Sequence, residues 1–207
     1  MLSDLMGSFF KVTVTALVAT ALIFTGLHQF IWRNQPYTYS PIRMATYEVR
    51  GAYGACSGVL IAPKQMLTAA HCLQMGDLFV KGVKAVVVKF NPVTDVALLF
   101  VEVDCPCVPV GDTPALDTNL VAVGYPLGIG VQYLSKGTSQ GDVPEYSHYM
   151  AMTVPLMFGN SGGGVFQFQN GKWKVVGVAS AMAGSAFGPA ENITMAVNVK
   201  SIKELLK

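Results

Sequence analysis

Charged residues are scarce in this chain. They make up 13% of its 207 residues, against 52% for hydrophobic residues, whereas globular domains carry about 25% charged residues. This composition excludes an intrinsically disordered chain and a coiled coil. After residue 44 the basic and acidic side chains balance at eleven each, so the body lacks the positive charge of an electrostatic nucleic-acid binder. The length suffices to bury a substantial core.

The amino-terminal region has no charged side chain at all between residues 12 and 32. As a helix, a segment of this length spans about 30 Å, the thickness of a bilayer's hydrocarbon core. Aromatic and basic residues flank it on both sides, as membrane interfaces favour: Phe9, Phe10, Lys11, Phe30, Trp32 and Arg33. The sequence therefore predicts a membrane anchor, a transmembrane helix, within residues 1–33, and a linker over residues 34–44.

A cleaved signal peptide is the alternative to the anchor, since residues 19–21 (Ala-Thr-Ala) imitate a cleavage site. These residues lie inside the apolar run, however, which favours the anchor. The orientation stays open, because Lys11 and the amino terminus on one side oppose Arg33 and Arg43 on the other.

The body of the protein, residues 45–207, has the pattern of an all-β fold. Short β-rich runs alternate with turn-forming residues, at 59–61, 85–90, 95–101, 120–123, 165–168 and 174–178. Only residues 200–207 have the spacing of an amphipathic helix. The stretch 105–117 is predicted to connect two similar halves, and the composition of residues 133–149 indicates a mobile surface region of the second half.

Three polar residues stand in unusual surroundings. His71 follows an apolar run and two alanines, Asp95 opens an apolar strand, and Ser161 lies among four glycines. Acyl transfer needs this combination, because a serine hydroxyl requires a base and an imidazole requires a carboxylate to fix its tautomer. Glycines allow the backbone N–H groups of Gly159 and Ser161 to face one point, as an oxyanion hole requires.

The remaining histidines and two acidic residues are weaker candidates for the same roles. His28 lies in the apolar segment, and His148 has no matching motif around it. Asp77 and Asp104 lie in turn-like or mixed-charge surroundings that indicate solvated loops.

Together these segments resemble the signatures of trypsin-like serine proteases, in the order His, Asp, Ser. The matching segments are residues 56–61, 67–72, 95–99 and 159–163, and the likeness covers most of residues 50–200. It is closest to the HtrA (DegP-like) branch, on the short gaps of 24 and 66 residues within the triad and on residues 121–128 and 195–199. The resemblance implies two six-stranded antiparallel β-barrels, with the active site between them and a short carboxy-terminal helix.

The chain departs from that branch in two respects. It ends at Lys207, so no PDZ domain is expected, and the pair Cys56 and Cys72 is more similar to the chymotrypsin branch. A viral or phage protease of the same fold would fit these features as well.

The four cysteines indicate in which cellular compartment the body of the protein lies. In the proteases that the chain resembles, a disulfide joins the positions of Cys56 and Cys72, and closing a loop of about 15 residues stabilises by about 3 kcal/mol. Such a bridge implies an oxidising compartment, so the body is expected outside the cytoplasm. Cys105 and Cys107 are expected to lie too close for an ordinary bridge. A zinc site of all four cysteines is the alternative, although their spacing lacks paired Cys-x-x-Cys motifs.

The resemblance also locates the pocket for the substrate residue before the scissile bond, at Pro155, Ser180, Ala181 and Met182. None of these is a carboxylate, so an Arg or Lys side chain would lose its hydration without gaining a partner. Small or medium apolar residues such as Val, Ala, Leu or Met are expected there, because Met157 and Met182 narrow the slot.

The sequence therefore predicts a membrane-anchored serine endopeptidase that acts on proteins or peptides through an acyl-enzyme. His71 is the general base and acid, Asp95 orients it, and Ser161 is the nucleophile; neither a cofactor nor a metal is needed. Two alternatives belong to other classes of protein. One is a catalytically silent binding module on the same fold, and the other is a structural membrane protein, which would leave the three motifs unexplained.

Overall fold

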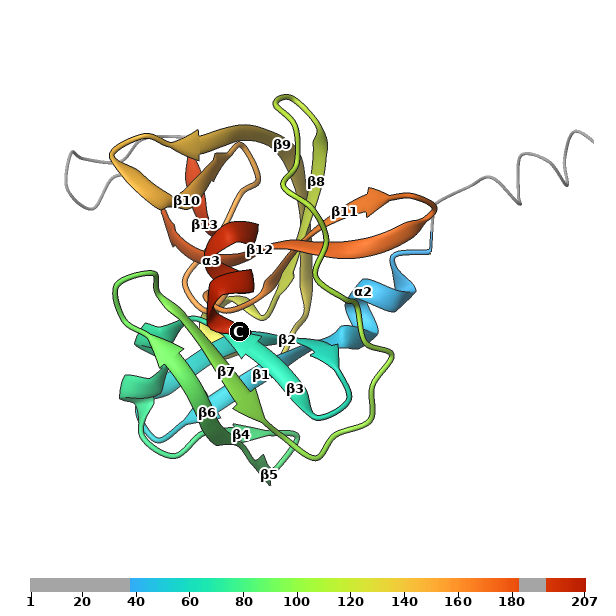
Figure 1. Cartoon of the computed structure of the whole chain (residues 1–207). Helices are drawn as coiled ribbons and strands as arrows, with labels where there is room; N and C mark the ends of the chain where they lie inside the picture. The colour runs from blue at the N-terminus through green and yellow to red at the C-terminus, as the bar shows by residue number, and fades with distance from the viewer. Residues whose placement is uncertain (1–37, 183–192) are drawn as a thin grey trace, which may run out of the picture. The chain divides into compact units, whose positions relative to one another are not determined.

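The computed structural model describes residues 38–182 and 193–207 (Figure 1). The predicted anchor, residues 1–33, and the first part of the predicted linker, residues 34–37, lie outside these residues. In the described part of the chain, no helix combines the length and the apolar character needed to cross a bilayer.

Seven antiparallel strands form the sheet of the first half. In chain order they are β1 (Thr46–Gly51), β2 (Gly54–Ala62), β3 (Gln65–Thr68), β4 (Phe79–Val80), β5 (Val83–Lys84), β6 (Val86–Asn91) and β7 (Val96–Phe100). Their spatial order is β5-β4-β1-β2-β3-β7-β6.

The prediction of a closed six-stranded barrel is wrong for this half. The sheet has seven strands, and within the described residues it does not close. The hairpin of β4 and β5 has only two residues in each strand, because the chain turns at Lys81 and Gly82, both with positive φ. A hairpin this short does not reach along β6, and none of the described strands pairs with the outer edge of β6.

The second half is the closed six-stranded barrel that was predicted. Its strands are β8 (Asn119–Gly124), β9 (Tyr133–Val143), β10 (Tyr146–Met152), β11 (Gly164–Gln169), β12 (Lys172–Met182) and β13 (Thr194–Asn198), in the order β10-β13-β12-β11-β8-β9. All six runs predicted as strands lie on or overlap strands of the two sheets.

Residues 133–149, predicted from composition as a mobile surface region, form the regular strand β9 and most of β10, and most of them are exposed or half-buried. The buried positions of β9 are small and polar, namely Ser135 and Ser139. Ser135 is satisfied by donating from Oγ to the Pro155 carbonyl at 2.7 Å. A strand that buries hydroxyls lacks the apolar alternation by which strands are recognised.

Four short helices complete the described chain: α2 (Ser40–Ala45), η1 (Ala70–Met75), η2 (Pro126–Gly128) and α3 (Val199–Leu205). Helix α2 corrects the prediction that residues 34–44 form a linker throughout, since Pro41 lies in its first turn and Ile42 and Ala45 are buried. The predicted carboxy-terminal helix is confirmed as α3, and Asn198 caps it by accepting from Ser201 N–H at 3.1 Å.

A shared core holds the two halves together. Val59 and Leu67 of the first sheet pack in one cluster with Val178 of the barrel and with Ile202 and Leu205 of α3. The segment between β7 and β8, predicted as the connection, is hydrogen-bonded to both halves through Val108 N–H to Leu60 O and Gly111 N–H to Val175 O. The loops that carry the predicted site residues therefore meet at a fixed junction.

Candidate active site

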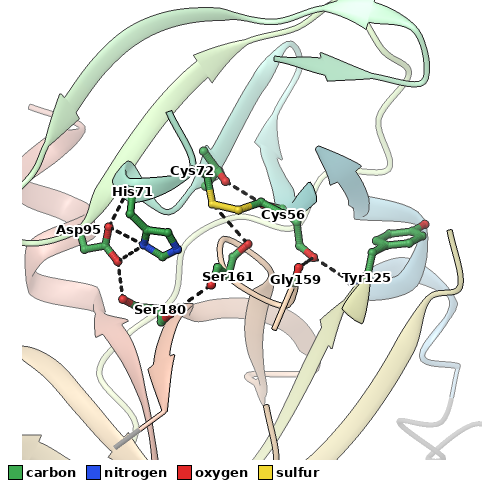
Figure 2. Close-up of a disulfide and its surroundings, with 10 residues drawn as sticks. Cys56, His71, Cys72, Asp95, Tyr125, Gly159, Ser161 and Ser180 are labelled. Carbon is green, nitrogen blue, oxygen red and sulfur yellow. Dashed lines mark hydrogen bonds and ion pairs between the residues drawn. A yellow bond between two sulfur atoms is a disulfide. The ribbon is translucent and has the colours of Figure 1, made fainter. Parts of the chain in front are cut away.

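His71 lies in η1, directly after β3. Ala69 and Ala70 before it are buried, which fixes the start of the helix, while the imidazole is 44% exposed. Its Nδ1 lies 2.9 Å from Oδ2 and 3.0 Å from Oδ1 of Asp95 (Figure 2). The backbone N–H of His71 also donates to Asp95 Oδ1, at 2.9 Å. Asp95 therefore holds both the ring and the main chain of the histidine.

Asp95 ends the tight turn between β6 and β7. Asn91 orders this turn by accepting from the N–H groups of Val93 and Thr94, and Asp95 adopts φ +52°, a left-handed conformation that aspartate tolerates better than most residues. The turn directs a carboxylate that is only 13% exposed toward His71.

The Asp95 carboxylate has a third donor, because Ser180 Oγ donates to Oδ2. Burial raises the pKa of this carboxyl, but the hydrogen bonds from His71 and Ser180 outweigh burial and hold its pKa below the ordinary value. Ser180 Oγ also lies 3.4 Å from the phenol oxygen of Tyr149. The sequence assigned Ser180 to the substrate pocket alone and missed this contact, since Ser180 and Asp95 lie far apart along the chain.

Ser161 lies on the loop between β10 and β11, and the first sheet holds its backbone. Ser57 N–H donates to Ser161 O at 2.8 Å, and Gly162 N–H donates to Ala179 O at 2.6 Å. The hydroxyl donates to the Ser180 carbonyl at 3.2 Å. Among the described residues no hydrogen bond joins Ser161 Oγ to the imidazole, although Figure 2 places His71 between Asp95 and Ser161. Free proteases commonly form such catalytic bonds only with substrate bound.

The peptide between Phe158 and Gly159 determines where the Gly159 N–H points. Phe158 O accepts from Leu127 N–H at 2.7 Å. Because the peptide is trans, the Gly159 N–H points the opposite way, away from Leu127. In the described part of the chain neither this group nor the Ser161 N–H has a hydrogen-bond partner. Two free donors on one glycine-rich loop are what an oxyanion hole needs.

The cysteines form two disulfides. Cys56 and Cys72 are joined with a Cα–Cα distance of 6.3 Å, as the resemblance implied, and the bridge ties β2 to η1 beside the site (Figure 2). Cys105 and Cys107 are also joined, at a Cα–Cα distance of 4.9 Å. The sequence predicted that this pair is too close for an ordinary bridge, and the structure joins the two sulfurs across the single residue Pro106. With their sulfurs bonded in pairs, the four cysteines do not form the alternative zinc site.

The predicted pocket residues lie on two segments. Pro155 is exposed between β10 and β11, Ser180 lies on β12, and Ala181 and Met182 end that strand; the side chains of the last two lie outside the description. Next to His71 and Asp95 a cavity of about 290 Å³ is lined by Leu73, Phe90 and Pro92, among others. Sequence reasoning missed this cavity, although Phe90 and Pro92 lie just before Asp95.

A closed antiparallel barrel joined to a second β-sheet, with a His–Asp pair and a glycine-rich serine loop where they meet, defines a chymotrypsin-like serine endopeptidase. Comparison with known families agrees. The family model for the trypsin-like peptidase domain matches residues 56–178, and the chain belongs to this family.

Solved structures with the same fold include HtrA-type proteases. A serine endoprotease from Yersinia pestis matches with a TM-score of 0.69 and 20% identity over 83% of this chain and 66% of its own. The HtrA-type protease AlgW with a tripeptide matches at 0.68 and 22%, over 81% and 60%. Rv3671c from M. tuberculosis, in an inactive form, matches at 0.68 and 18%, over 83% and 89%. No curated protein sequence matches the chain.

Replacing Gly159 with alanine is expected to lower kcat/KM for a peptide substrate by about a hundredfold or more. The glycine has φ +91°, and a Cβ there would lie 2.7 Å from Leu127 N and from Tyr125 O, so the oxyanion donor must move. Gly171→Ala is the matched control, because Gly171 also has positive φ, +76°, but has open space around it. Equal activity in the two variants would contradict the role of Gly159.

The low pKa of Asp95 predicts a pH-dependent contribution to stability. A carboxylate whose folded pKa is depressed stabilises the native state above its unfolded pKa, near 4, and loses that contribution as the pH falls through the folded pKa. The difference in unfolding free energy between the wild type and Asp95→Asn should therefore shrink as the pH falls from 6 to 2. Denaturant titrations measure it, with the exposed Asp77→Asn as control. A difference independent of pH would contradict the assignment.

Proposed function

We propose that the chain hydrolyses peptide bonds with Ser161 as nucleophile, His71 as general base and acid, and Asp95 as the orienting carboxylate. The observation that carries the proposal is the double contact between Asp95 and His71 Nδ1, at 2.9 and 3.0 Å. A carboxylate acceptor places the imidazole proton on Nδ1 and leaves the Nε2 lone pair free to take a proton.

The reaction begins with a rotation of the Ser161 hydroxyl from the Ser180 carbonyl toward Nε2. His71 takes the proton as Oγ attacks the substrate carbonyl carbon, and the carbonyl oxygen becomes an oxyanion that accepts from Gly159 N–H and Ser161 N–H. The imidazolium, stabilised by Asp95, then gives its proton to the departing amine, and an acyl-enzyme remains. A water molecule, deprotonated by His71, then attacks the acyl carbon in the same way. Ser161 leaves with a proton from His71, and the carboxylic acid product is released.

Purified protein is expected to react with a fluorophosphonate probe at Ser161, as measured by mass spectrometry of the labelled peptide. Labelling should vanish in Ser161→Ala and His71→Ala, and Asp95→Asn should lower the rate by several orders of magnitude. His148→Ala is the control for loss of a histidine and should still be labelled. A chain that folds but is not labelled would favour the silent binding module, and turnover by Ser161→Ala would contradict the mechanism.

The preference for small or medium apolar residues before the scissile bond is part of the same proposal. It is supported by the absence of a carboxylate among Pro155, Ser180, Ala181 and Met182, because a cationic side chain would be desolvated without a partner. A peptide-library digest is expected to give cleavage mainly after Val, Ala, Leu or Met. Cleavage mainly after Lys or Arg, or after Asp or Glu, would contradict an apolar pocket.

Membrane anchoring through residues 1–33, with the protease body on the non-cytoplasmic side, completes the proposal. The support is the uncharged segment over residues 12–32 and, for the side of the membrane, the disulfides. The full chain is expected to stay in the membrane fraction after carbonate washing, and a variant without residues 1–33 should be soluble and still hydrolyse small esters. A mature protein that begins between Gly26 and Tyr39 would point to a signal peptide or self-processing instead.

A further inference from the structure

The turn that holds the oxyanion loop has an unfavourable backbone conformation. In η2, Leu127 has φ +60°, a left-handed conformation that costs energy for any residue with a Cβ. Its side chain is 63% exposed, so core packing does not hold it there. Yet the N–H of Leu127 donates to Phe158 O, the bond that turns the Gly159 N–H in the opposite direction. Contacts from outside the turn must therefore stabilise it.

One such contact comes from Arg50 on β1. Its Nη2 donates to the carbonyl of Gly128, the residue after Leu127, at 3.1 Å. The guanidinium is oriented by Glu48, which accepts from Nε at 2.8 Å and from Nη2 at 3.0 Å. This two-point contact fixes the plane of the guanidinium more firmly than a single bond would. Glu48 and Arg50 are thus linked to Phe158 through the Leu127–Gly128 turn.

We infer that the Glu48–Arg50 ion pair is a positioning element for the oxyanion hole. It acts through the Gly128 carbonyl and the Leu127 N–H to keep the Phe158 carbonyl turned away and the Gly159 N–H available. The catalytic part of this inference rests on the proposed function, and the conformational part does not. Arg50 and Glu48 touch no reacting atom in this scheme.

The solvent exposure of Arg50 allows its positioning role to be distinguished from a contribution to the stability of the whole fold. The Arg50 side chain is 57% exposed, and an ion pair with a solvated partner contributes little to global stability. Glu48 is 15% exposed, so Arg50→Ala is expected to lower the melting temperature slightly by leaving this carboxylate unpaired. The larger effect is expected on the population of one turn. The affinity for a transition-state analogue depends on the population of this turn, because the analogue binds to the oxyanion donors. Binding of the substrate in its ground state depends on these donors less.

The experiment compares the full-length wild type, Arg50→Ala, Arg50→Lys and Lys64→Ala. Lys64 is the control, because its side chain is 52% exposed, close to that of Arg50, and forms an ion pair with Glu102 at 2.7 Å. Arg50→Ala should bind a boronoleucine peptide about tenfold more weakly and lose a similar factor in kcat, with KM and the melting temperature nearly unchanged. Arg50→Lys should be intermediate, because one ammonium group cannot reproduce the planar fork of a guanidinium.

Amide hydrogen exchange of Leu127 gives a second readout that does not need catalysis. In Arg50→Ala the protection of this N–H should fall by about tenfold, whereas Lys64→Ala should match the wild type. An unchanged Leu127 amide, or boronate affinity and kcat equal to those of Lys64→Ala, would overturn the inference. If the wild type does not react with the fluorophosphonate but the Leu127 amide responds to Arg50→Ala, the proposed function fails and the link between Arg50 and the turn stands.

Discussion

The serine loop approaches the first sheet so closely at Gly162 that no side chain fits between them. A Cβ on this residue would collide with the Ser57 carbonyl and the Thr68 hydroxyl. Hydrogen bonds hold the contact, since Ser57 N–H donates to Ser161 O at 2.8 Å and Thr68 Oγ1 donates to Ser57 O at 2.7 Å. Because η1 follows β3 almost directly, this contact sets the spacing between Ser161 and His71. The rest of the site is built around that spacing.

Most polar groups of the site form hydrogen bonds within the protein, and these bonds orient the groups that react in the proposed mechanism. Three donors offset the burial of the Asp95 carboxylate, two from His71 and one from Ser180. The Ser161 hydroxyl donates to the Ser180 carbonyl, a hydrogen bond that it exchanges for one to the imidazole in the proposed mechanism. The backbone around Gly159 is already oriented. In the proposed mechanism little reorganisation is therefore left for the moment of reaction, which is how electrostatic preorganisation lowers a barrier.

The parts of the fold and of the candidate site that the sequence predicted correctly were those marked by short local motifs. His71, Asp95 and Ser161 were recognisable because each is a polar residue in an apolar or glycine-rich setting, and the six predicted runs contained the strands with clear apolar patterns. Contacts between distant segments were missed, such as that of Ser180 with Asp95 and that of Arg50 with Gly128. Strand β9 was missed for a different reason, because it buries small hydroxyl side chains, and the open edge of β6 depends on the length of a neighbouring hairpin.

In the proposed mechanism, Ser161 attacks a carbonyl carbon at the junction of the two halves, and the backbone N–H groups of Gly159 and Ser161 receive the negative oxygen. A crystal structure with a peptide boronic acid tests this most directly, since boron mimics the tetrahedral carbon. We expect boron bonded to Ser161 Oγ, one boronate oxygen within about 3 Å of both backbone nitrogens, and the Phe158 carbonyl still accepting from Leu127 N–H. A boronate bound elsewhere, or a Phe158 carbonyl turned into the hole, would contradict it.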